Sequence, residues 1–136
     1  EFVRQGRAVL FSSTFQLVQR LLAAKRDLRL ASELKRLDRF EALILDDLGY
    51  VQQSREEMEV LFTLIAERYE RRSILLTSNL VFSQWDQIFK DPMTTAAAID
   101  RIVHHSVILE LREIESYRAE EAKRRIKASK QPKEEK

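Results

Sequence analysis

The stretch that most restricts the fold of this chain is residues 43–47 (LILDD), where a run of apolar residues ends in two adjacent carboxylates. The apolar residues do not alternate with polar ones, which is typical of a strand that is buried on both faces. Strands of this kind belong to parallel sheets, and an acid at the end of one lies at the rim where α/β folds bind ligands. The stretch therefore predicts an α/β fold with a candidate site at Asp46 and Asp47.

Other apolar segments alternate with helix signals along the chain. The predicted strands cover residues 8–12, 42–46, 74–78 and 107–111. Ser13 is placed to cap a helix, and Ser54 can form a capping box with Glu57. Asp91 followed by Pro92 is a third helix start. This alternation of strands and helices predicts a parallel sheet wound by right-handed crossovers.

The composition excludes several classes of protein and of site. Because the 136 residues contain no cysteine, neither a disulfide framework nor a thiolate metal site is available. No apolar run approaches the roughly 20 residues that span a bilayer, and there is no secretory signal, so we expect a cytoplasmic protein without a membrane partner. The formal net charge of +2 permits nucleic-acid binding but does not require it.

Three polar residues at predicted strand ends could serve a nucleotide site. In P-loop ATPases the first acid after such a strand holds Mg²⁺, and the next can orient the attacking water. Asn79 directly follows another predicted strand, where a polar side chain can position water beside the γ-phosphate. The alternative for Asp46, Asp47 and Asn79 is a role in turns. A Gly-rich phosphate loop ending in Gly-Lys-Ser/Thr does not occur in these residues, whose glycines are Gly6 and Gly49.

Arg101 and the pair His104-His105 lie late on the helix that begins near Pro92. Arg101 is interpreted either as a surface residue paired with an acid or as an arginine finger for a neighbouring subunit's phosphate. The histidines are interpreted as helix-terminal residues that favour the helix dipole. We do not expect them to bind a metal, because adjacent helical residues do not face each other and no third ligand has a suitable spacing.

A basic segment, residues 25–39, is predicted to continue a helix in which leucines anchor one side and charges face outward. Its leucines are Leu28, Leu30, Leu34 and Leu37, and its candidate binding residues are Lys25, Arg26, Arg29, Lys35 and Arg36. The segment after residue 118 is dominated by charged residues and is predicted to be a solvated helix that frays into disorder.

The order of these motifs resembles that of the IstB-like ATPases, which are helper proteins of insertion-sequence transposition. The resemblance extends from about Phe2 to Arg118 and rests on 43–50 (LILDDLGY), 67–71 (ERYER), 77–80 (TSNL) with Trp85, 98–105 (AIDRIVHH) and 116–118 (SYR). The family belongs to the AAA+ superfamily, in the branch that includes the bacterial helicase loader and replication initiator. The resemblance implies a three-layer α/β fold with a P-loop-type parallel sheet flanked by helices. It divides the chain into a partial AAA+ ATPase domain, 1–118, and a charged tail, 119–136.

The resemblance also implies roles for the candidate residues. Asp46 matches the Walker B acid that binds Mg²⁺ through water, and Asp47 matches the catalytic acid. Most AAA+ proteins carry Glu there, and the shorter Asp implies slower turnover. Asn79 matches the first sensor and Arg101 the arginine finger. The implied cofactors are ATP and Mg²⁺.

The implied partners are DNA, a transposase and further copies of the same protein. Residues 21–37 match an extra helical insertion that faces DNA in this branch, where basic side chains suit phosphate contacts. The expected function is that of an ATP-dependent DNA-binding helper that activates a transposase. The alternatives are a helicase loader of the same branch and a non-catalytic DNA-binding or assembly fragment.

Parts of the family pattern have no counterpart in these 136 residues. They are the DNA-targeting region, the first and central strand of the sheet, and the phosphate loop. We therefore expect this chain to be a piece of a larger protein or a broken gene copy. We also expect that it does not hydrolyse ATP alone, and that a slot separates strands 74–78 and 107–111.

Overall fold

The structure, a computed structural model, describes residues 1–49 and 54–111. The chain divides into a compact unit, 1–106, and a second unit, 107–136. The elements in chain order are β1 (Val9–Ser13), α1 (Thr14–Arg26), α2 (Leu30–Leu37), β2 (Ala42–Leu48), α3 (Arg55–Arg68), β3 (Ser73–Ser78), the 3₁₀ turn η1 (Phe82–Gln84), α4 (Asp86–Phe89) and α5 (Pro92–Val103). Among the described residues, no helix combines the length and the apolar character needed to cross a bilayer. The predicted charged tail lies outside the described residues.

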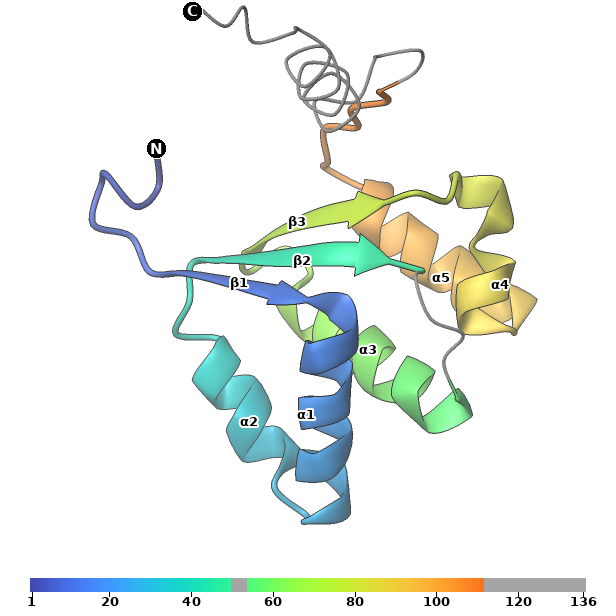
Figure 1. The fold of residues 1–136 in the computed structure, drawn as a ribbon, viewed down its shortest axis with the longest axis horizontal. Coiled ribbons are helices and arrows are strands. Elements are labelled where there is room, and N and C mark those ends of the chain that lie inside the picture. Colours follow the sequence, from blue (N-terminus) through green and yellow to red (C-terminus); the bar gives the residue numbers. More distant parts are fainter. Residues whose placement is uncertain (50–53, 112–136) are drawn as a thin grey trace, which may run out of the picture. The chain divides into compact units, whose positions relative to one another are not determined.

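The three strands form a parallel sheet in the order β1-β2-β3 (Figure 1). In the register of the sheet, Leu43 of β2 lies between Leu10 of β1 and Ile74 of β3. The central position of β2 explains why Leu43 and Leu45 are almost completely buried. The prediction of an α/β fold with a parallel sheet flanked by helices is confirmed.

The helices α1, α2 and α3 pack against one face of the sheet, as Figure 1 shows. The core between them is built from large apolar side chains that are fully buried, among them Leu21, Leu37, Leu43, Leu61 and Leu64. The other face carries a row of paired residues, Phe11, Ile44 and Leu75. Phe11 is 64% exposed and Leu75 is 53% exposed. The described residues of the compact unit therefore leave this second face open.

The helix starts follow the predicted caps. Ser13 accepts a hydrogen bond from the backbone N–H of Gln16 at the start of α1. At the start of α3, the Ser54 hydroxyl accepts from the N–H of Glu57, and the Glu57 carboxylate accepts from the N–H of Ser54. Asp91 caps α5 before Pro92. Each cap satisfies N–H groups that lack a partner within the helix, and such a cap contributes about 1 kcal/mol.

The prediction of a continuous basic helix over residues 25–39 is wrong. The helix α1 ends at Arg26, and α2 begins at Leu30. Leu28 lies in the intervening turn with φ of +56°, and its side chain is 95% exposed. A residue in this left-handed conformation ends a helix, so Leu28 does not anchor the segment.

The strand predicted for residues 107–111 is not formed. These residues have no regular secondary structure, and Val107, Leu109 and Leu111 are each more than 80% exposed. A β-strand exists through hydrogen bonds to a neighbouring strand. Among the described residues, β3 pairs with β2 alone, so its outer edge has no partner strand.

Candidate functional site

Asp46 and Asp47 lie at an irregularity in the sheet. The register between β2 and β3 shifts between Leu45 and Leu48, which places both acids in a bulge at the end of β2. Bulges disrupt the regular ladder and re-aim side chains, and they are frequent beside active sites. The two acids therefore lie outside the regular pairing of β2 with β3, whereas Asp46 stays in register with Ser13 of β1.

Thr77 of β3 holds the two acids in place. Its hydroxyl donates a hydrogen bond to Oδ1 of Asp46 at 2.6 Å. The same hydroxyl oxygen accepts a hydrogen bond from the backbone N–H of Asp47 at 2.8 Å. One side chain thus orients the carboxylate of Asp46 and the backbone of Asp47 together.

The backbone of Asp47 has φ of +64°, a conformation that is uncommon for residues other than glycine. Its side chain is exposed, whereas the next residue, Leu48, is fully buried. The chain therefore turns sharply between a core residue and an accessible carboxylate. Residues held in such conformations are concentrated at functional sites.

Asp46 is also fixed from the side of β1. The Thr14 hydroxyl, at the start of α1, donates to the backbone oxygen of Asp46 at 3.0 Å, and Thr14 is only 2% exposed. The analysis of the sequence did not identify Thr14 or Thr77 as site residues. A threonine beside a predicted strand end is a weak signal, because its partner lies more than 30 residues away in the sequence.

Asn79 follows β3 directly and lies at the same edge of the sheet as Asp46 and Asp47. The pairing of Leu48 with Ser78 brings these two strand ends together. The Asn79 side chain is exposed and makes no hydrogen bond within the described part of the chain. This edge therefore combines two carboxylates and one amide that are accessible from solvent.

Arg101 forms no ion pair with an acid among the described residues. Its guanidinium donates to the backbone oxygen of Ala97 at 3.1 Å and lies 5.0 Å from the ring centroid of Phe62 on α3. None of the ion pairs found among residues 1–49 and 54–111 involves Arg101, so the interpretation as half of a surface ion pair has no support there. The cation–π contact fixes the side chain against α3.

The candidate DNA-binding residues lie on the surface near α1 and α2, and most of them pair with acids. Lys25 lies 2.8 Å from Glu59, and the other contacts are Arg26–Glu56 at 4.0 Å, Arg29–Asp27 at 2.6 Å and Arg36–Glu33 at 2.9 Å. The hydrogen bond from Lys25 is the main cause that lowers the pKa of Glu59. Exposed pairs of this kind are weak, so a phosphate group can compete with these carboxylates.

Arg68 is a buried arginine that the analysis of the sequence did not single out. It is 2% exposed, and its guanidinium donates to backbone oxygens of Leu37, Phe40 and Ser73 at 3.0–3.1 Å. These three carbonyls belong to the end of α2, the turn before β2 and the start of β3. Arg68 therefore joins the elements at the amino ends of the strands and has a structural role.

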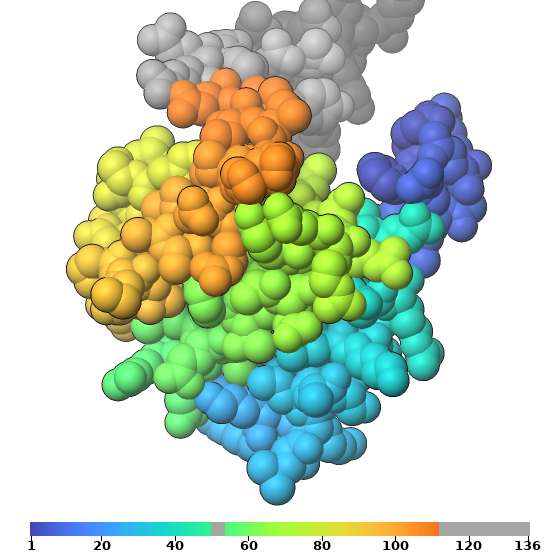
Figure 2. Space-filling view, turned by 180° about the vertical axis from the view of Figure 1, so that it is seen from behind, coloured from blue at the N-terminus to red at the C-terminus, as the bar shows by residue number. Residues whose placement is uncertain are grey.

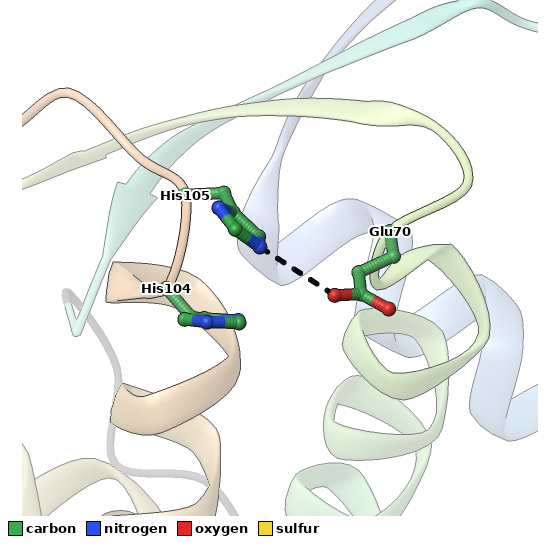
Figure 3. Close-up of side chains that lie close together, drawn as sticks. All are labelled: Glu70, His104 and His105. Atoms are coloured by element: carbon green, nitrogen blue, oxygen red, sulfur yellow. Dashed lines mark ion pairs between the residues drawn. The ribbon is translucent and has the colours of Figure 1, made fainter.

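The histidine pair differs from its predicted environment. Glu70, after α3, lies beside His104 and His105, with Oε1 of Glu70 at 3.6 Å from Nε2 of His105 (Figure 3). The sequence showed no third ligand at a suitable spacing, whereas the structure places Glu70 within reach of both histidines. Glu70 is distant from the histidines in the sequence, and the packing of α3 against α5 brings them together.

A family model and two related proteins all match this chain to ATP-binding proteins of insertion sequences. Residues 1–125 match the family described as IstB-like ATP binding protein. The chain is 51% identical over 125 residues to a protein of Sinorhizobium fredii named as an insertion sequence ATP-binding protein, covering 90% of this chain and 42% of the relative. It is 40% identical over 122 residues to a protein of Pseudomonas aeruginosa named as an ATP-binding protein of insertion sequence IS21, covering 90% and 46%. The chain thus spans about half the length of the curated relatives it matches.

A solved structure of the DnaC helicase loader has a similar fold. It superposes with a TM-score of 0.65 at 20% sequence identity and covers 79% of this chain and 63% of the other. At this identity the likeness concerns the fold alone, and it agrees with a parallel sheet flanked by helices.

Proposed function

Since this chain belongs to the IstB-like ATP-binding protein family, we propose that the intact protein is an AAA+ ATPase that helps transposition. In this proposal the protein binds DNA, assembles with further copies of itself and activates a transposase, all in the bacterial cytoplasm. The bulge at Asp46 and Asp47, with Thr77 bonded to both, is the observation that most supports an ATPase site. Residues 1–106 supply only part of that site.

The residues at this edge of the sheet suit ATP with Mg²⁺. Carboxylate oxygen is a ligand that Mg²⁺ accepts, usually together with several retained waters, and Asp46 offers an oriented carboxylate. Bound Mg²⁺ would neutralise charge on the phosphates. We assign Asp47 to orient the attacking water and take up its proton, because its side chain is exposed, whereas Asp46 is half-buried and accepts a hydrogen bond from Thr77. Asn79 is assigned to position the same water from the neighbouring strand end.

We propose that Arg101 acts on the ATP site of a neighbouring copy. Its guanidinium carries a full charge, rests on an aromatic ring and has no carboxylate partner among the described residues. Such a group is free to stabilise negative charge on a phosphate.

We assign DNA contacts to the surface around α1 and α2. Lys25, Arg26, Arg29, Lys35 and Arg36 are all partly or fully exposed there. The acid partners of Lys25, Arg26 and Arg29 are at least half exposed, and DNA phosphates can displace them at modest cost, whereas Glu33, the partner of Arg36, is 16% exposed and also pairs with Arg20. The relatives that carry insertion-sequence names favour transposition over helicase loading. A transposase gene beside the gene for this protein would support the first role.

The ATPase proposal is tested in the full protein with Asp46→Asn. We expect this change to abolish Mg²⁺-dependent ATP hydrolysis, because it removes the charge that holds the ion, while the amide can still accept from Thr77. The matched control is Asp86→Asn, which alters an exposed aspartate on α4 and should retain activity. Unchanged turnover in Asp46→Asn, measured by phosphate release, would refute the assignment.

A further inference from the structure

The chain reverses direction directly after α5, and this turn brings two adjacent histidines together. The helix ends at Val103, His104 has φ of −59° and ψ of 122°, and His105 has φ of +61°. The two imidazole centroids are only 3.9 Å apart. Neighbouring residues within a helix point in different directions, so the rings can meet only because the helix has already ended.

The end of α3 supplies a carboxylate to the same point. Glu70 also has positive φ, +57°, and its side chain lies opposite His105 (Figure 3). Ligand atoms of Glu70, His104 and His105 all lie within 4.8 Å of one another, and all three residues are exposed. The space-filling view shows the end of α3, in green, beside the end of α5, in orange (Figure 2).

We propose that Glu70, His104 and His105 bind a divalent transition-metal ion of the Zn²⁺ type. Two imidazoles and one carboxylate are a donor set suited to Zn²⁺, Co²⁺ or Ni²⁺ rather than to Mg²⁺ or Ca²⁺, which prefer oxygen ligands alone. Bonds of about 2.0–2.2 Å require the three side chains to close slightly around the ion. Exposed side chains can do so by small rotations, and a water or a group from another molecule completes the coordination.

Tyr69 provides the outer contact that orients His104. Its hydroxyl lies 2.5 Å from Nδ1 of His104, and the two rings are stacked. When the hydroxyl oxygen accepts the proton of Nδ1–H, Nε2 of His104 carries the lone pair that a metal needs. Metal-binding histidines commonly have such a partner on the second ring nitrogen.

An ion pair between Glu70 and His105 accounts for only part of this arrangement. That pair does not involve the imidazole of His104, although its ring centroid lies only 3.9 Å from the ring centroid of His105. A metal ion uses both rings in their neutral form together with the carboxylate.

The cluster lies near the start of β3, whereas Asp46 and Asn79 lie at the carboxyl ends of the strands. It is therefore separate from the proposed ATP site and would clamp the end of α3 to the end of α5.

The test uses the full protein that contains this chain, purified without a histidine tag. Co²⁺ is added first, because its visible absorption reports coordination by imidazole, and Zn²⁺ is then titrated calorimetrically. We expect Zn²⁺ to displace Co²⁺, and millimolar Mg²⁺ to leave the Co²⁺ spectrum unchanged. These two histidines are the only ones in the 136 residues, which also contain no cysteine. The double variant His104→Asn/His105→Asn therefore measures any binding elsewhere in the protein.

Single variants identify the ligands. His104→Asn, His105→Asn and Glu70→Gln should each weaken Zn²⁺ binding by at least about tenfold. Asn suits position 105 because it tolerates positive φ. The matched control Glu67→Gln alters an exposed glutamate in the last turn of α3, three residues before Glu70, and should bind as the parent does. Zn²⁺ should also raise the melting temperature of the parent but not of His105→Asn. A parent protein with no Co²⁺ spectrum beyond that of the double variant, or an equal loss in Glu67→Gln, would overturn the proposal.

Discussion

Arg68 links more backbone segments than any other side chain described above. It bonds carbonyls from α2, the turn before β2 and the start of β3, and those carbonyls lie up to 31 residues away. Burial is the main cause that lowers the pKa of Arg68, and Asp38 opposes this by raising it. The guanidinium nevertheless stays charged at neutral pH, which strengthens each of its hydrogen bonds.

Arg68→Met should therefore destabilise the fold by about 3 kcal/mol, because buried carbonyls lose their donor while the apolar contacts of the side chain are largely kept. Urea unfolding of the full protein measures the change. Arg72→Met is the control, since Arg72 is exposed and lies 3.8 Å from Asp38 in a surface ion pair. A cost for Arg68→Met no larger than for the control would show that the hydrogen bonds contribute little.

Thr77 affects the candidate site through its hydrogen bonds to Asp46 and Asp47. The Thr77 hydroxyl bonds the Asp46 carboxylate and the Asp47 backbone, so its loss would free both acids without altering either of them. The strain at Asp47, whose φ is +64°, persists because this hydroxyl and the buried Leu48 hold the chain on both sides.

The helix α3 begins with a capping box whose strength depends on pH. The backbone hydrogen bond from Ser54 is the largest cause that lowers the Glu57 pKa below its usual 4.5. A carboxyl whose pKa is lowered by folding stabilises the folded state fully above the pKa of the unfolded state. That contribution is lost as pH falls through the lower pKa of the folded state.

We therefore expect the stability of the protein to decline as pH falls below about 4.5, with Glu57 contributing to the decline. Glu57→Gln should lower stability at neutral pH by about 0.5–1 kcal/mol and should make the dependence on pH shallower in this acidic range. Unfolding by urea at a series of pH values measures both effects. The control Glu56→Gln affects an exposed acid in the same turn that is not part of the capping box. An identical pH profile for parent and Glu57→Gln would contradict the prediction.

At the scale of the whole molecule, Arg101 is expected to act on the ATP site of a neighbouring copy within an assembly of the full protein. In the full protein, Arg101→Ala should leave ATP affinity nearly intact and lower hydrolysis by about 10³–10⁵-fold, the range for arginine fingers. The cation–π contact with Phe62 would also be lost, so the folded state of the variant is checked by its melting temperature. Arg72→Ala, which alters an exposed arginine outside the candidate site, is the control.

Mixing the variants tests whether Arg101 acts between copies. Asp47→Asn subunits keep Arg101, and Arg101→Ala subunits keep Asp47, so a mixed assembly contains some interfaces with both residues intact. We expect the mixture to regain part of the activity that neither variant has alone. If the two variants co-assemble and remain inactive, Arg101 is better explained as a structural residue that packs on Phe62.

Several features followed from residues that are near one another in the sequence. The apolar run 43–45, which ends in two aspartates, indicated a buried strand, and the caps at Ser13, Ser54 and Asp91 indicated three helix starts. These features depend on periodicity and on hydrogen bonds that span three residues, so a short stretch contains the information. The family resemblance added the order of the motifs, and the match over residues 1–125 confirmed it.

Other features arose from contacts between residues that are distant in the sequence. The bond between Thr77 and Asp46, and the meeting of Glu70 with His104 and His105, depend on the packing of separate elements. Residues 107–111 have an apolar pattern that suits a strand, yet a strand also needs a partner for its N–H and C=O groups. Periodicity reports which side chains favour burial, but the formation of a ladder and the convergence of ligands require a second segment at the right place in space.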